Sequence, residues 1–197
     1  MGGCNTENKT NTNDKPTTNH NGDGHDHGDH DHDDHDHGNS AEIEDRSIQV
    51  SEQQNSATTP IINSYIAIKN ALVKDDKSGA AEGGEALLKA FSDFDMTKLT
   101  KEQHTEYMDI MEDAKEQTEH IIKSPIDHQR EHFEVLSVDI KDLIALVGTD
   151  QKLYEVFCPM ANEGKGAIWI SEIEDIQNPF FGNKMLKCGE VQERINE

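Results

Sequence analysis

The sequence predicts an all-α fold: an up-and-down four-helix bundle with an irregular C-terminal cap, preceded by a polar tail. Apolar residues recur at helical spacing in four successive segments between residues 60 and 147. That periodicity stops at Gly148, and residues 5–21 are almost entirely Asn, Thr and Lys, which cannot form a core. We therefore expect a disordered tail over residues 1–59 and one ordered domain over residues 60–197, long enough to fold around a single core.

The first helix is expected from Pro60 to near Asp75-Asp76, and the second over residues 78–92. Thr59-Pro60 is typical of an N-cap followed by the first helical residue. The first apolar stripe comprises Ile61, Ile62, Tyr65, Ile66, Ile68, Leu72 and Val73. Within the second helix, Gly83-Gly84 either weakens the helix or allows a neighbouring element to approach closely.

The third and fourth helices are expected over residues 101–122 and 125–147. Thr100 and Gln103 have the spacing of a capping box, which marks the start of the third helix. Ser124-Pro125 begins the fourth helix, and Gly148 ends it. Because the connections between the four segments are short, antiparallel neighbours are the economical arrangement.

The region after Gly148 lacks a sustained helical period and is rich in Gly and Pro. We expect it to form a cap of short strands or turns that folds against the helices, and Glu190–Glu197 is too short to assign. One possible arrangement, a hairpin, would bring Cys158 and Cys188 together.

Two sulfur pairs in this cap are the strongest candidates for a site. Cys158 and Met160 form a Cys-x-Met pair, and Met185 and Cys188 form a Met-x-x-Cys pair. Thiolate and thioether sulfur are soft ligands that suit Cu(I), and by the same softness Ag(I). Pro159 restricts the backbone of the first pair to a stiff, non-helical corner.

Other interpretations of these residues remain open. Two cysteines in a small secreted domain often form a disulfide, which would remove both thiolates from metal chemistry. Methionine is commonly a core filler. His128 and His132 share a face of the fourth helix, where a packed cap would let either of them complete a sulfur site, although a solvated face is the simpler interpretation.

The tail contains a tract in which histidine alternates with aspartate. Its histidines are His25, His27, His30, His32, His35 and His37. Imidazole binds Zn(II), Cu(II) and Ni(II), and the interleaved carboxylates attract cations. We expect multivalent, unselective metal buffering here, although a solubilising or pH-responsive linker would have similar charge.

Charge and composition exclude some functions and suggest a compartment. The formal net charge of −22 argues against nucleic-acid binding, and no apolar run approaches the length of a membrane span. Cys4, after Met1-Gly2-Gly3, resembles the lipid-modified cysteine of a mature bacterial lipoprotein, while the same residues fit a myristoylation pattern with Cys4 available for palmitate. A start without any lipid anchor is the remaining interpretation.

The cap resembles a known family. The segments that carry the resemblance are Cys158-Pro159-Met160-Ala161-Asn162, Gly164-Lys165-Gly166-Ala167, Trp169, Asn178-Pro179-Phe180-Phe181-Gly182 and Met185-Leu186-Lys187-Cys188-Gly189, with Gln129-Arg130, Phe133 and Leu136-Ser137 on the fourth helix. They are similar to a bacterial domain of unknown function found in secreted proteins and lipoproteins and appended to periplasmic adaptors of heavy-metal efflux systems. The resemblance implies a helical architecture and copper or silver handling, and it does not imply catalysis.

The favoured hypothesis is an extracytoplasmic heavy-metal-binding lipoprotein, located in the bacterial periplasm or at the cell surface. It would capture or buffer copper, silver or zinc, or transfer such ions to an efflux adaptor. The alternative is a non-catalytic partner-binding module with a Cys158–Cys188 disulfide, in which only the tail binds metal. An enzyme with Cys158 as nucleophile is disfavoured, because no Cys/His/Asn constellation that would activate the thiol is recognisable.

Overall fold

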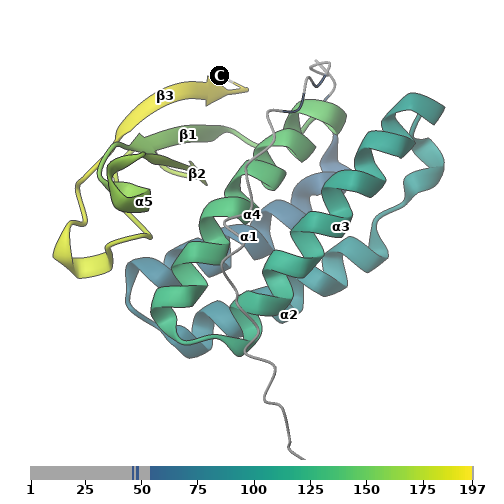
Figure 1. Cartoon of the computed structure of the whole chain (residues 1–197). Coiled ribbons are helices and arrows are strands. Elements are labelled where there is room, and N and C mark those ends of the chain that lie inside the picture. The colour runs from purple at the N-terminus through teal and green to yellow at the C-terminus, as the bar shows by residue number, and fades with distance from the viewer. Residues whose placement is uncertain (1–45, 47, 49–53, 197) are drawn as a thin grey trace, which may run out of the picture. The chain divides into compact units, whose positions relative to one another are not determined.

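The computed structural model describes residues 46, 48 and 54–196. Within residues 54–196, four long helices are followed by three strands (Figure 1). The helices are α1 (Thr59–Val73), α2 (Lys77–Asp93), α3 (Lys101–Lys123) and α4 (Ile126–Val147). The strands are β1 (Leu153–Cys158), β2 (Ala167–Ser171) and β3 (Glu190–Ile195). Short turns complete the chain: η1 (Ser56–Thr58), η2 (Met96–Lys98), α5 (Ala161–Gly164) and η3 (Gly182–Lys184).

The helices begin and end close to the predicted residues, because local capping chemistry fixes their ends. Thr100 and Gln103 form the predicted capping box at the start of α3. Gly148 ends α4 with a φ of 78°, a conformation that glycine adopts without steric cost. Pro60 lies in the first turn of α1, but the N-cap is Thr58 rather than the predicted Thr59, and it makes no side-chain capping hydrogen bond.

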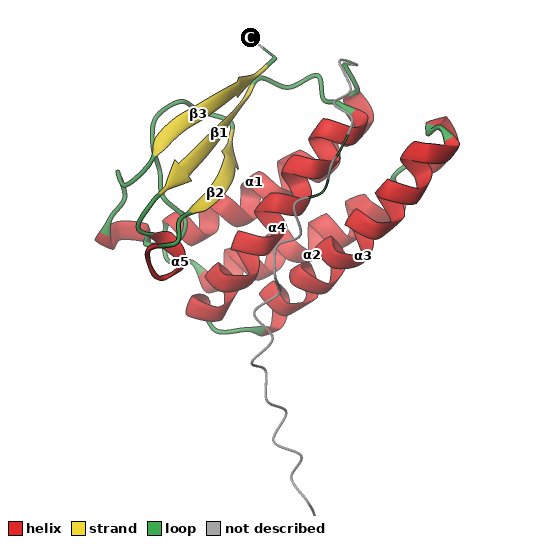
Figure 2. Ribbon diagram, turned by 45° about the horizontal axis from the view of Figure 1, so that its top comes forward, coloured by secondary structure: helices red, strands yellow, loops and turns green. Residues whose placement is uncertain are grey.

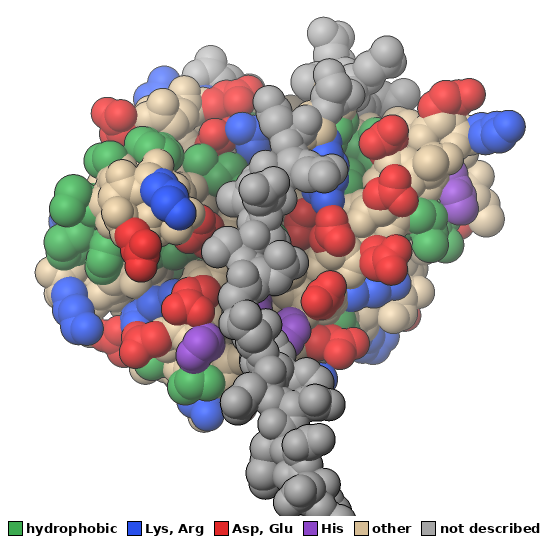
Figure 3. Space-filling model, viewed as in Figure 1, with side chains coloured by type: hydrophobic (Ala, Val, Ile, Leu, Met, Phe, Trp, Pro, Cys, Tyr) green, Lys and Arg blue, Asp and Glu red, His purple; other side chains and the backbone are tan. Residues whose placement is uncertain are grey.

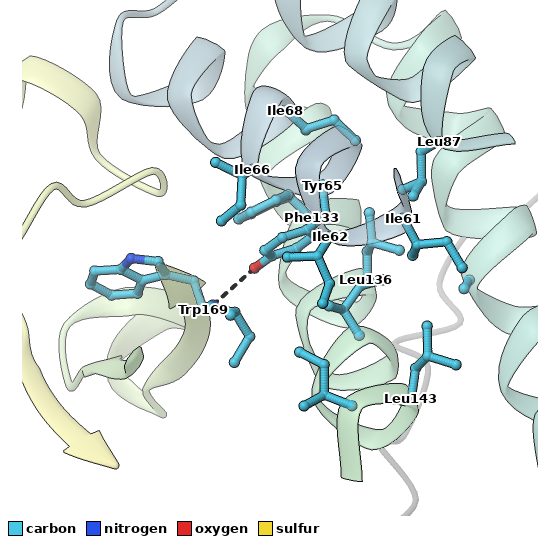
Figure 4. Close-up of a cluster of buried hydrophobic side chains, with 14 of the residues drawn as sticks. Ile61, Ile62, Tyr65, Ile66, Ile68, Leu87, Phe133, Leu136, Leu143 and Trp169 are labelled. Carbon is cyan, nitrogen blue, oxygen red and sulfur yellow. Dashed lines mark hydrogen bonds between the residues drawn. The ribbon is translucent and has the colours of Figure 1, made fainter. Parts of the chain in front are cut away.

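The predicted apolar stripe of α1 is buried in a core shared with α2, α3 and α4. Figure 4 shows the part of this core that α1, α2, α4 and Trp169 form. Tyr65 of α1 stacks on Phe133 of α4, with ring centroids 4.9 Å apart. Gly83 permits the close approach of α1 and α2, since a Cβ atom there would lie 2.8 Å from the Ile68 side chain. None of the helices in the described residues is long and apolar enough to cross a membrane.

The C-terminal region contains the short strands that were expected in the cap, but they form a three-stranded antiparallel sheet in the order β2-β1-β3 within the described residues, so the all-α class is too narrow (Figure 2). β1 is central, with Val156 opposite Trp169 of β2 and Phe157 opposite Glu190 of β3. The physical reason is that β1 and β2 are short runs of apolar and aromatic residues that are largely buried, a composition that suits strands. β3, which was not predicted, is an exposed edge strand specified mainly by its pairing with β1.

Buried polar contacts attach the sheet to the helices. The Tyr65 hydroxyl accepts a hydrogen bond from the Ile170 backbone N–H at 3.1 Å (Figure 4) and forms another with Ser137 at 2.7 Å. Lys69 is fully buried, and its Nζ lies 2.6 Å from Oε2 of Glu172, just after β2. Since a buried ammonium without a partner would be costly, Glu172 is held at this end of the sheet.

Some residues before Pro60 also contact the helices. Thr58 is buried and donates a hydrogen bond to the Gly148 carbonyl. Arg46 pairs with Asp113 of α3 and with Asp139 and Asp142 of α4. Burial raises the pKa of Asp139 to about 7, while its bond with Arg46 opposes that shift.

Two glycines, Gly164 at the end of α5 and Gly166 just after it, differ in how closely other side chains surround them. Gly164 and Gly166 have φ values of +85° and +90°, but only at Gly166 would a Cβ atom collide, at 2.3 Å from the Phe157 ring. We expect Gly166→Ala to lower the free energy of unfolding by about 3 kcal/mol, and Gly164→Ala by about 1 kcal/mol for the backbone alone. Urea unfolding followed by circular dichroism measures both. Equal losses of unfolding free energy in the two variants would show that contact with the Phe157 ring is not the reason for the glycine at Gly166.

Candidate sulfur site

The sheet brings the two cysteines of the ordered domain together. Cys158 ends β1, and Cys188 lies two residues before β3, whose first residue, Glu190, pairs with Phe157. Their Sγ atoms are 2.7 Å apart. Cys158 is fully buried and Cys188 is partly exposed, so a ligand reaches the pair from the Cys188 side. The strands that achieve this are β1 and β3, which are not consecutive, rather than a simple hairpin of β1 and β2.

The local electrostatics keep the Cys188 thiol protonated. The hydrogen bond with Cys158 raises the pKa of Cys188 above its ordinary value, and burial and the Cys158 charge act in the same direction. The Met160 backbone opposes this shift by hydrogen-bonding to the Cys188 sulfur. A metal ion that binds here must therefore displace a proton.

Met160 and Met185, the two predicted thioether ligands, are both tied to Cys188 through backbone atoms. The Met185 carbonyl accepts a hydrogen bond from the Cys188 N–H at 3.0 Å, and Met185 is half-buried. Met160 is 56 % exposed beside the pair. The structure thus brings Cys158 and Cys188 together, while Met160 in the turn after β1 and Met185 after η3 are linked to Cys188 only through backbone atoms. An exposed thioether next to a thiol pair is free to turn toward a bound ion.

Asn178 holds the loop that carries Cys188. Its side chain is fully buried, and its Nδ2 donates to the Cys188 carbonyl at 2.7 Å. Its Oδ1 accepts hydrogen bonds from the Phe180 and Phe181 backbone N–H groups, which closes a turn. Its own N–H donates to the Leu186 carbonyl. One side chain therefore fixes both ends of the Asn178–Cys188 segment.

Arg130 fastens this loop to the helices. Its Nε donates to the Pro179 carbonyl at 3.0 Å, and its Nη2 donates to the Leu72 carbonyl at 3.1 Å. The same guanidinium pairs with Asp75, whose pKa is lowered mainly by that hydrogen bond. Asp75 also accepts a hydrogen bond from Asn183 in η3. Since Arg130 offers several donors in a fixed plane, it joins α1, α4 and the loop at one point.

Two glycines of the motif make room for these contacts. At Gly182, with a φ of +51°, a Cβ atom would lie 2.5 Å from Asp75 and 2.9 Å from Arg130. At Gly189, with a φ of +146°, it would lie 2.7 Å from the Trp169 ring. The motif residues Asn178, Gly182 and Gly189 therefore form a frame around the cysteines. The sequence identified these residues only as members of a shared motif, and it did not predict this structural role.

No group of three or more His, Cys, Asp or Glu side chains in the described part of the chain could by itself hold a metal ion. Neither His128 nor His132 therefore completes the sulfur site: His128 pairs with Glu131, and His132 packs against His120 of α3. The predicted tail ligands His25, His27, His30, His32, His35 and His37, and the predicted lipidation site Cys4, lie outside the described residues.

The role of Asn178 can be tested through the reactivity of Cys188. We expect Asn178→Ala to increase the alkylation rate of Cys188 in the reduced protein by about tenfold, because losing a buried hydrogen bond loosens the loop. Asn183→Ala, in the same loop but exposed, is the matched control and should change the rate by less than about twofold. Peptide mapping by mass spectrometry separates Cys188 from the other two cysteines. The same rate in both variants would contradict the proposed frame.

Comparison with known proteins bears on the helices rather than on the sulfur pair. Neither a search of curated proteins nor a search of solved structures found a match. Residues 61–152 match the family model described as a protein of unknown function, DUF3347. The match ends one residue before β1, so Cys158 and Cys188 lie beyond it. The helical part of this chain, α1 to α4, is therefore similar to a family of unknown function.

Proposed function

We propose that this protein binds soft heavy-metal ions, Cu(I) or Ag(I), at Cys158 and Cys188. The observation that carries the proposal is the contact between the two sulfur atoms, 2.7 Å apart, inside a frame of buried hydrogen bonds. Thiolates are the preferred ligands of these ions, and one thiol of the pair is accessible from solvent. Met160 supplies an exposed thioether as a third ligand, and Met185 lies in the same loop as Cys188.

The raised pKa of Cys188 supports a proton-coupled mode of binding. At neutral pH the thiol carries its proton, and Cu(I) or Ag(I) replaces that proton as the ion binds to sulfur. Affinity should therefore rise with pH, and acid should favour release. Such a site suits reversible capture and transfer better than permanent storage.

The tail supports the same function with a different ligand class. Its six alternating histidines would collect Zn(II), Cu(II) or Ni(II), within an acidic protein of net charge −22. In this proposal Cys4 carries a lipid anchor, and the protein works in the bacterial periplasm or at the cell surface. Its partner would be a heavy-metal efflux adaptor, and no catalytic step is involved.

The same sulfur contact favours a second candidate function. In an oxidising compartment Cys158 and Cys188 would lose two electrons and two protons to a thiol oxidant and form a disulfide. The cap would then be a closed recognition surface for a protein partner, and metal binding would be confined to the tail. Mass measurement after alkylation without reductant distinguishes the two: unmodified Cys158 and Cys188 in protein isolated from its native compartment would favour this candidate.

Competition titration with Cu(I) and a chromogenic chelator, under anaerobic reducing conditions, tests the metal proposal. The protein should be the full chain with the tail histidines changed to asparagine, so that Cu(I) bound to the tail is not counted with Cu(I) bound to the cap cysteines. We expect one tightly bound Cu(I), and more than about tenfold weaker binding after Cys158→Ser or Cys188→Ser. Cys4→Ser, which removes the third thiol, is the control and should retain the affinity. Binding that survives both cap substitutions would refute the sulfur site.

A further inference from the structure

Two histidines from different helices stack face to face, far from the sulfur motif in the sequence. His120 lies near the end of α3 and His132 near the start of α4. Their ring centroids are 4.4 Å apart, and the ring planes differ by 15°. His120 is exposed and His132 is half-buried. Two packed helices thus bring two imidazoles, each a nitrogen donor, into contact at the surface.

A neighbouring amide fixes the tautomer of His132. Its Nδ1 lies 2.9 Å from Oε1 of Gln117, which is one turn before His120 on α3. Because an amide oxygen only accepts hydrogen bonds, Nδ1 carries the proton and Nε2 keeps its lone pair. A histidine that binds metal typically donates its other ring N–H to such a partner. Gln117 therefore prepares His132 to act as a ligand through Nε2.

The surroundings keep that lone pair available and attract cations. Burial lowers the pKa of His132 to about 4, and the charges of His120 and His128 add to this shift. The exposed residues in the C-terminal half of α3 include Glu112, Glu116 and Glu119, the last of which pairs with Lys123, and acidic side chains are numerous over α3 in Figure 3. Their field raises the local concentration of divalent ions.

We propose that His120 and His132 form a second metal site, selective for borderline divalent ions such as Zn(II), Cu(II) or Ni(II). Nε2 of His132 and a ring nitrogen of His120 bind the ion, and water occupies the remaining positions. The exposed His120 ring turns out of the stack to do so, while Gln117 holds His132 in place. The site uses nitrogen donors, so it differs in ligand class from the proposed sulfur site and does not depend on it.

The test uses the full chain in which the seven tail histidines, His20 included, are changed to asparagine. Thermal unfolding with Zn(II) alone is compared among this protein and its His120→Asn, His132→Asn and His104→Asn derivatives. We expect Zn(II) at about 100 times its Kd to raise the Tm by about 5 °C in the parent and the His104→Asn control. His120→Asn and His132→Asn should each lose most of that rise. Because His120 is exposed, its variant should fold even if His132→Asn does not.

A second measurement observes the ligand atoms directly. Two-dimensional proton–nitrogen NMR of the imidazole groups should show the His132 Nε2 signal shifting on addition of Zn(II), with Nδ1 still protonated. Zn(II) bound to Cys158 and Cys188 would leave the His120 and His132 signals unchanged, so failure of this proposal is separable from failure of the sulfur site. Unchanged histidine signals, or an equal Tm rise in all four proteins, would overturn the inference.

Discussion

The Arg130 guanidinium is the contact on which the arrangement of the cap depends. Between β2 and β3 the chain runs through residues 172–189, and its far end must return beside Cys158. Closing such a loop costs conformational entropy, which local contacts must offset. Arg130 of α4 donates hydrogen bonds to the Pro179 carbonyl in this loop and to the Leu72 carbonyl in α1. The Asn178 side chain then holds Cys188 through a hydrogen bond to its carbonyl. The pairing of β3 with β1 completes the enclosure of the two sulfurs.

The proposed function divides metal binding by ligand chemistry. The sulfur pair is buried on one side and carries a raised pKa at Cys188, which suits a soft monovalent ion and proton-coupled release. The stacked histidines on α3 and α4 keep a neutral nitrogen donor in an acidic field, which suits borderline divalent ions. One small domain would thereby distinguish two classes of ion without a cage of many ligands.

The helices could be predicted from sequence because their signals are local: a capping box at Thr100, a glycine at the end of α4 and apolar residues at helical spacing. β3 could not, since Glu190–Ile195 is exposed and polar and becomes a strand by pairing with β1. The cysteine pair was identifiable as a candidate from its residue types, while its closure depends on Arg130 and Asn178, whose roles need tertiary structure. The His120–His132 pair was missed because only the packing of α3 on α4 brings the rings together.

The most direct test of the account is X-ray absorption at the copper edge, on the full chain with asparagine in place of the tail histidines and loaded with one equivalent of Cu(I). The account predicts copper bonded to the sulfur atoms of both Cys158 and Cys188, and one fewer sulfur ligand after Cys188→Ser. A spectrum with only nitrogen or oxygen ligands, unchanged by that substitution, would contradict it.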